Sequence, residues 1–145
     1  ARDLVQAIAD RLYVLYDVIL RRALQFQRVG IVWGSDDMGF RSGTLISPAD
    51  LREFVLPGHR RMAALSHAAG RPYLLHACGN IAAIMEDLIA DVGIDGKHSF
   101  EDTIEQVTDA KATYGQRIAL LGGIDMDFLC RATPEQVRGL RVQKS

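Results

Sequence analysis

Residues 71–80 read RPYLLHACGN, an apolar run that passes directly into a histidine, a cysteine and a glycine. The segment from Pro72 to Leu75 is continuously apolar rather than alternating, which is typical of a parallel strand buried on both faces. Side chains alternate between the faces of a strand, so His76 and Cys78 point the same way if the strand continues through them. Gly79 then allows the backbone to turn away.

The rest of the chain alternates between short apolar segments and helical patterns. The expected strands are residues 29–33, 72–75, 93–100 and 117–123. The expected helices are residues 4–19, 48–65, 81–89, 103–114 and a last one that Thr133, Pro134 and Gln136 begin as a capping box. Pro57 is expected to interrupt the second helix, because proline lacks a backbone N–H and clashes with the preceding turn. This order predicts four βα units.

Four βα units fit either a small doubly wound sheet or part of a (β/α)8 barrel. A complete barrel usually needs about 250 residues, so this chain of 145 residues would supply half of one. It starts without methionine inside a helical pattern, and no linker rich in Pro, Gly or Ser divides it. We therefore expect residues 1–145 to be a single partial domain, with unpaired strand edges near residues 29–33 and 118–121.

The composition is that of a soluble globular domain, with 48% hydrophobic residues, 24% charged residues and a net charge of -1. The basic residues form no stripe, which argues against nucleic acid as a partner. No apolar run approaches the roughly 18 residues of a membrane span, and no signal-peptide pattern is present. The expected location is the cytoplasm, where Cys78 and Cys130 would be thiols or metal ligands rather than a disulfide.

Polar residues follow each expected strand, at the edge where parallel α/β folds place their chemistry. In chain order these candidate site residues are Asp36 and Asp37, His76 and Cys78, His98 and Glu101, and Asp125 and Asp127. Imidazole nitrogen and thiolate sulfur suit zinc, with bond lengths of about 2.0 to 2.3 Å. An isolated H-x-C is also consistent with a packed core pair, since cysteine is often buried. At this level both interpretations of the pair stay open.

Three motifs in order carry a resemblance to a known family. They are DDMGFRSGTLISPADLREFVLPGHRRM from Asp36, YLLHACGNI from Tyr73 and RIALLGGIDMDFLCRATPEQVR from Arg117. The chain resembles the C-terminal half of the uroporphyrinogen decarboxylase superfamily, which also contains corrinoid-dependent and methylcobamide:coenzyme M methyltransferases. The resemblance implies a (β/α)8 barrel. The arginines and aspartate of the decarboxylase pocket lie in the N-terminal half, which this chain lacks.

Within that superfamily, the H-x-C pair is a feature of the methyltransferase branch. The resemblance implies that His76 and Cys78 hold zinc, together with a cysteine from near the final strand that would lie beyond Ser145. A thiol substrate entering the open position of the metal would become a thiolate, able to attack a methyl group on the cobalt of a corrinoid. The implied partners are therefore a small thiol and a corrinoid or corrinoid protein.

The other candidates carry alternatives. Glu101 is either a further ligand or base, or a charge at a helix N-terminus. His98 lies either behind the metal or in the core. Of Asp36 and Asp37, catalytic candidates like Glu101, one is expected to face the pocket and the other to cap the following loop. Asp125 is more typical of a turn, and Cys130 of a small packing residue; His59 and His67 are assigned no function.

Three functions follow from these alternatives. The first is zinc-dependent methyl transfer between a methyl-corrinoid and a thiol. The second is a metal-free porphyrinogen decarboxylase, a carboxy-lyase. The third is a non-catalytic half-barrel that associates with another copy or with a missing half, in which His76 and Cys78 are merely packed.

Overall fold

The computed structural model describes residues 1–101, 103–124 and 126–143, and side chains as far as residue 139. Its elements in chain order are α1 (Arg2–Ala23), β1 (Val32–Ser35), α2 (Pro48–Phe54), α3 (Leu56–Ala68), β2 (Tyr73–His76), the short helices η1 (Ala82–Ile84) and η2 (Asp87–Val92), β3 (Gly96–His98), α4 (Val107–Tyr114), β4 (Ala119–Leu121), α5 (Met126–Arg131) and α6 (Pro134–Gln143). The predicted alternation of strands and helices is confirmed.

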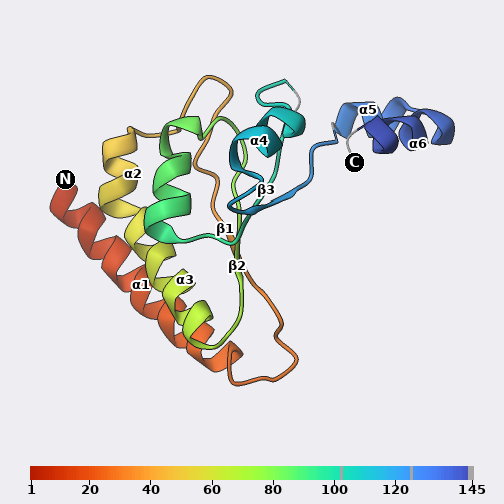
Figure 1. Cartoon of the computed structure of the whole chain (residues 1–145). Helices are drawn as coiled ribbons and strands as arrows, with labels where there is room; N and C mark the ends of the chain where they lie inside the picture. The colour runs from red at the N-terminus through yellow and green to blue at the C-terminus, as the bar shows by residue number, and fades with distance from the viewer. Residues whose placement is uncertain (102, 125, 144–145) are drawn as a thin grey trace.

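The four strands form one parallel sheet in the order β1-β2-β3-β4 (Figure 1). Ser35, His76, His98 and Leu121 are paired in register across the four strands, so they form one row. Because parallel neighbours in register point to the same face, the side chains of this row share one side of the sheet. The fold is that of a partial (β/α)8 barrel, with β1 and β4 at its open edges as the sequence predicts.

The core lies between the sheet and the helical layer of α2, α3, η1 and η2 (Figure 1). Tyr73 and Leu75 of β2 project into it and are fully buried. Leu51, Leu56, Ile84, Met85 and Leu88 supply much of the helical side. The alternation of side chains along β2 therefore leaves His76 on the opposite face, away from the core.

α1 packs against α3 on the outer side of the helical layer (Figure 1). Arg2 bridges Asp50 and Glu53 of α2 at 2.7 and 2.5 Å, and Arg61 of α3 bridges Asp17 at 2.8 Å. The apolar stripe seen in the sequence lies on the other side of the helix. Its members are between 44% and 66% exposed: Leu4, Ile8, Leu12, Leu15 and Ile19.

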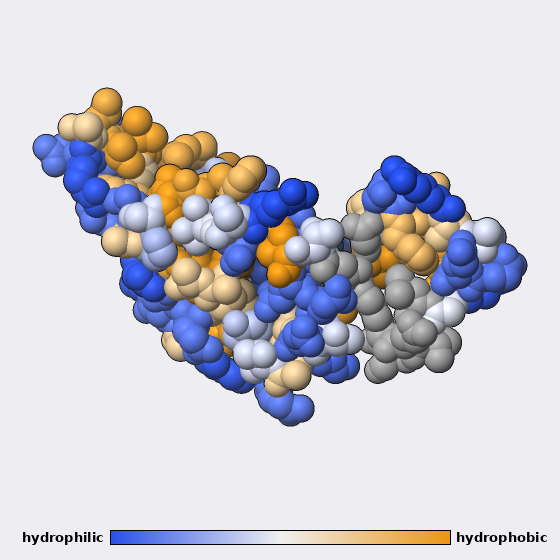
Figure 2. Space-filling model, turned by 90° about the horizontal axis from the view of Figure 1, so that it is seen from above, coloured by the Kyte–Doolittle hydropathy of each residue, from blue (hydrophilic) through white to orange (hydrophobic). Residues whose placement is uncertain are grey.

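This exposed stripe is part of an apolar area at the end of the molecule that carries the N-terminus (Figure 2).

α5 and α6 lie apart from the sheet and its helices (Figure 1). In the described residues, no helix is both long and apolar enough to cross a membrane.

Several boundaries differ from the prediction, and the last two strands are shorter than the predicted 93–100 and 117–123. The first strand runs from Val32 to Ser35 rather than over residues 29–33. The helix predicted from Thr103 begins at Val107, because residues Ile104 and Glu105 form a turn on the Glu101 carbonyl and Gln106 is extended. The helix predicted over residues 81–89 is divided into η1, a 3-10 helix, and η2, a π helix that continues to Val92.

Other local predictions are confirmed. Pro57 lies in the first turn of α3, directly after the break at Val55 that separates it from α2. Thr133 and Gln136 form the capping box, in which the Gln136 N–H donates to the Thr133 Oγ1 and the Thr133 N–H to the Gln136 side chain. Sequence signals that depend only on near neighbours are thus realised.

The ion pair between α1 and α3 should make the fold sensitive to acid. Hydrogen bonds from Arg61 and Arg21 lower the pKa of Asp17 from 3.8 to about 2. A carboxyl with a lowered pKa stabilises the folded state above its ordinary pKa, and this contribution is lost as the pH falls towards 2. We expect Asp17→Asn to lower the free energy of unfolding at pH 6 and to have little effect near pH 2, as measured by urea denaturation.

The matched control is Asp10→Asn, which removes a carboxylate of the same helix that bonds only Gln6 in the described structure. With Asp10→Asn, the difference between the free energies of unfolding at pH 6 and near pH 2 should be the same as in the wild type. An equal loss of stability for Asp17→Asn at both pH values would contradict the prediction.

Candidate metal centre

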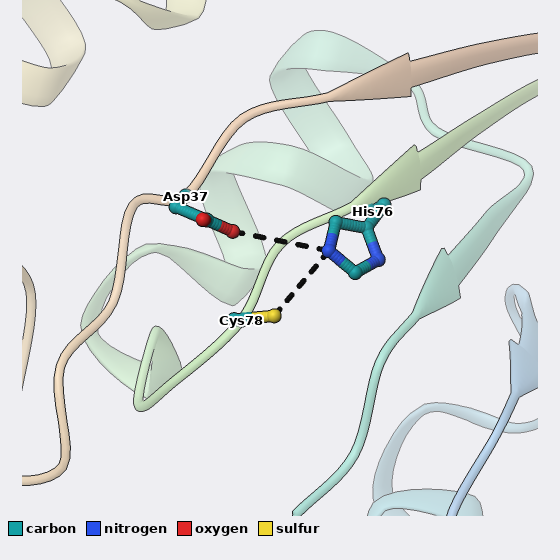
Figure 3. A group of neighbouring side chains, drawn as sticks. All are labelled: Asp37, His76 and Cys78. Atoms are coloured by element: carbon teal, nitrogen blue, oxygen red, sulfur yellow. Dashed lines mark hydrogen bonds and ion pairs between the residues drawn. The ribbon is translucent and has the colours of Figure 1, made fainter.

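Asp37, His76 and Cys78 gather at the carboxyl ends of β1 and β2 (Figure 3). One ligand atom from each residue lies within 4.8 Å of the others. The His76 Nε2 is 3.3 Å from the Cys78 Sγ and 3.8 Å from the Asp37 carboxylate. The three donors therefore point at one another from two adjacent strand ends, although Asp37 lies 39 residues before His76 in the chain.

Strand geometry explains which donors meet. The Asp36 N–H donates to the His76 carbonyl at 3.0 Å, so the pairing of β1 with β2 continues one residue past the strand. Because side chains alternate, Asp37 lies on the His76 side and Asp36 on the opposite side. Asp37 is therefore the aspartate that lies beside His76 and Cys78, whereas Asp36 lines a cavity between α1, β1 and α3.

His98 contacts the other nitrogen of His76. The two Nδ1 atoms are 2.7 Å apart, and the Trp33 ring lies against His98 with a centroid distance of 5.4 Å. A hydrogen bond between two nitrogens needs one donor and one acceptor. Burial and the neighbouring His76 and Lys97 lower the pKa of His98, which favours neutral imidazole. If the His76 Nδ1–H donates to His98, the His76 Nε2 lone pair faces Cys78 and Asp37.

A tight turn carries Cys78. Gly79 has φ +74°, a left-handed value that glycine adopts without strain, and its Cα packs against the backbone of Gly39. A Cβ on Gly79 would be 2.7 Å from the Phe40 nitrogen. The Gly79 N–H donates to the Glu101 carboxylate at 3.1 Å. The structure thus places Glu101 beside the turn, outside the three-residue cluster.

The electrostatic surroundings of Cys78 hold both signs of charge. Burial and the Asp37 carboxylate raise the pKa of the Cys78 thiol. Lys97 is buried on the neighbouring strand, with its ammonium 4.0 Å from the centre of the Phe100 ring. Burial lowers the pKa of Lys97 to about 8, while Glu105, Cys78 and Glu101 oppose this shift. A bound cation would offset the negative charge around Cys78 and favour its thiolate.

The remaining candidates lie elsewhere. Asp36 contacts His59 on the helical side of the sheet, an arrangement for which the sequence carried no signal beyond a histidine in a helix. Asp127 pairs with Arg131 on the surface of α5, and Asp125 lies outside the described residues. Cys130 is exposed on α5, so its interpretation as a packing residue is wrong. The cause is that α5 is not packed against the core.

The donor set fits zinc. Nitrogen, sulfur and carboxylate oxygen are its protein ligands, and three of them leave the open position that catalytic zinc sites keep. Histidine ligands are usually held through their second nitrogen, as His76 is by His98. The cluster is therefore chemically suited to a catalytic zinc ion as well as close in space.

Comparison with known proteins assigns the family. The uroporphyrinogen decarboxylase (URO-D) family pattern matches residues 12–143. A methylated-thiol:coenzyme M methyltransferase of Methanosarcina mazei is 39% identical over 97 residues, which are 66% of this chain and 24% of that protein. The methylcobamide:CoM methyltransferase MtaA of Methanosarcina barkeri is 28% identical over 116 residues, which are 77% of this chain and 33% of that protein.

The chain thus spans about a quarter to a third of the length of these relatives. No solved structure matches it significantly. The family match covers nearly the whole chain, including every residue of the cluster. The chain belongs to the uroporphyrinogen decarboxylase family, near its corrinoid methyltransferase branch.

Proposed function

We propose that this chain is part of an enzyme that transfers a methyl group between a methyl-corrinoid and a thiol, with zinc held by Asp37, His76 and Cys78. The single observation that supports this best is the convergence of these three side chains at the carboxyl edge of the sheet. The names of the relatives support the reaction class, because they are methyltransferases of methylcobamide, coenzyme M and a methylated thiol.

Zinc bound there would supply a Lewis acid that keeps a substrate thiol in its thiolate form at neutral pH. The new S–CH3 bond forms as the Co–C bond breaks, the electron pair of that bond stays on cobalt, and the thiol proton leaves to solvent. A cysteine from outside this chain would be the fourth ligand, and the substrate thiol would then take the place of Asp37 at the metal. The residues of this chain have the task of holding the metal and orienting its ligands.

Two residues around the cluster have supporting roles in this proposal. His98 holds His76 with its Nε2 towards the metal position. Glu101 accepts the Gly79 N–H and so holds the turn that carries Cys78. Glu101 thereby acts on the site through the backbone rather than as a base.

The role of His98 leads to a test. We expect His98→Leu to weaken zinc binding by about 10- to 100-fold, the usual cost of losing the residue behind a histidine ligand. His98→Asn keeps an acceptor near the His76 Nδ1 and should retain most of the affinity. Zinc affinity would be measured by competition with a chromophoric chelator, and equal affinities for His98→Leu and the wild type would exclude the role.

The reaction itself is tested on a longer protein that contains this chain and the rest of the barrel, with methylcobalamin as donor, 2-mercaptoethanesulfonate as thiol and zinc added. Methyl transfer is followed by the loss of the methylcobalamin absorbance and by the methylated thiol. We expect turnover that Cys78→Ser abolishes. A protein that binds no zinc and releases carbon dioxide from the carboxylate side chains of a porphyrinogen would instead support the decarboxylase function.

An association partner is also part of the proposal. Within the described residues, the stripe on α1 leaves apolar side chains exposed. The edge of β1 that faces away from β2 has no neighbouring strand in the sheet. Another βα layer, from a missing half or a second copy, would cover both surfaces. Light scattering over a range of concentrations distinguishes these two partners. If the partner is a second copy, the measured mass should rise towards that of a dimer as the concentration increases.

A further inference from the structure

Tyr73, His59 and Asp36 form a hydrogen-bonded chain that leads from the core to the edge of the metal centre. The Tyr73 hydroxyl is 2.8 Å from the His59 Nδ1, and the His59 Nε2 is 3.2 Å from the Asp36 carboxylate. Tyr73 is fully buried and His59 is 4% exposed, whereas the Asp36 side chain is 46% exposed. A buried pair therefore ends on a carboxylate at the surface.

Hydrogen-bond chemistry sets the direction of this chain. A carboxylate only accepts, so the His59 Nε2 carries the proton that it shares with Asp36. The Tyr73 hydroxyl then donates to the unprotonated Nδ1, and burial raises the pKa of Tyr73, which keeps the hydroxyl protonated. Tyr73 thus selects one tautomer of His59, and that tautomer presents its N–H to Asp36.

The surrounding backbone leaves room for this arrangement. Gly34 of β1 lies against the Tyr73 hydroxyl, and any Cβ at Gly34 would overlap it. His59 itself is fixed in the first turns of α3, next to Gly58, whose Cα faces the Tyr13 ring. His59 is buried and bonded to the fully buried Tyr73, so its imidazole is a fixed anchor for Asp36.

Asp36 immediately precedes Asp37, and the two side chains lie on opposite sides of the extended backbone. Fixing Asp36 towards His59 therefore fixes Asp37 towards His76 and Cys78. We propose that Tyr73 and His59 are positioning residues that hold the Asp36–Asp37 segment in the orientation that presents the Asp37 carboxylate to the metal. Asp36 itself is then an anchor rather than a catalytic group. This inference rests on the proposed function in one respect, that Asp37 is a ligand.

The test measures cobalt(II) binding, with its visible spectrum as a report on the ligand set. Cobalt(II) is used because it takes the same ligands as zinc and is coloured. We expect His59→Leu and Asp36→Ala to bind cobalt about 10-fold more weakly, in the range of outer-shell changes. Asp36→Asn retains an acceptor for the His59 N–H and should bind within about 2-fold of the wild type.

His59→Gln should restore part of the affinity, because its amide can accept from Tyr73 and donate to Asp36. The control is Arg60→Leu on the same helix, which removes an exposed side chain paired with Asp91 and should leave cobalt binding unchanged. Wild-type affinity and spectrum in His59→Leu would overturn the inference. So would an equal loss in Asp36→Asn and Asp36→Ala, because the carboxylate charge would then be needed.

A second measurement without metal separates this inference from the proposed function. Nitrogen-15 NMR of the metal-free chain should show His59 protonated at Nε2, with a mixture of tautomers in Tyr73→Phe. The side-chain couplings of Asp37 should indicate one rotamer in the wild type and averaging in His59→Leu. Absence of metal binding in the wild type would overturn the zinc proposal alone, whereas protonation at Nδ1 or identical Asp37 couplings would overturn the positioning role.

Discussion

His76→Ala and Cys78→Ser are each expected to abolish zinc binding, so that the metal content after dialysis falls from about one zinc per chain to almost none. Each variant removes one of the three donors that converge in the cluster. Loss of a direct ligand should weaken binding by more than the roughly 100-fold that an outer-shell change costs. Serine is nearly isosteric with cysteine, but its hydroxyl does not ionise at neutral pH and cannot replace the thiolate.

The matched control is Cys130→Ser, because Cys130 is the second cysteine of the chain and is exposed on α5. Its zinc content should equal that of the wild type. Zinc retained in both His76→Ala and Cys78→Ser would mean that the metal binds elsewhere in the chain. The His76–Cys78 pair would then be merely packed. Circular dichroism of each variant checks that the fold is intact.

Gly79→Ala is expected to destabilise the folded chain by about 3 kcal/mol, through left-handed strain and overlap with a neighbouring backbone. Gly79 has φ +74°, and a Cβ there would meet the backbone of Gly39 and the Phe40 nitrogen, which cannot move aside as a flexible side chain could. Relief of the overlap would separate the two loops and shift Cys78. The free energy of unfolding in urea and the zinc affinity should both fall.

Gly43→Ala is the control for this change. Gly43 lies in the same loop as Gly39, and a Cβ there meets no atom within 4 Å. Its replacement should change stability by less than about 0.5 kcal/mol, as is usual for surface positions. Similar unfolding curves for Gly79→Ala and Gly43→Ala would contradict the close approach of the two loops.

Local patterns in the sequence were sufficient for the elements and for part of the site. The apolar run before His76 and the two-residue spacing to Cys78 predicted a strand with two donors on one face, and the structure shows both donors within 3.3 Å of each other. The Thr133 capping box and the break at Pro57 likewise depend only on adjacent residues. These features are local, so a single sequence contains them.

Features that depend on contacts between distant segments were not visible. Nothing in a helical histidine signals that His59 meets Tyr73 and Asp36, because that contact joins α3 to two strands. Only the register of β1 against β2 shows that Asp37 lies on the side of His76 and Asp36 on the opposite side. Periodicity placed α1 correctly but could not tell that its apolar stripe is exposed.

X-ray absorption at the zinc edge, recorded on the zinc-loaded chain with and without 2-mercaptoethanesulfonate, shows whether Cys78 binds the metal and whether a thiol joins it. We expect one zinc–sulfur distance of about 2.3 Å from Cys78 and nitrogen or oxygen ligands at about 2.0 to 2.2 Å. Addition of the thiol should raise the number of sulfur ligands from one to two. No sulfur ligand before the addition, or no change after it, would contradict a Cys78-bound zinc that activates a thiol.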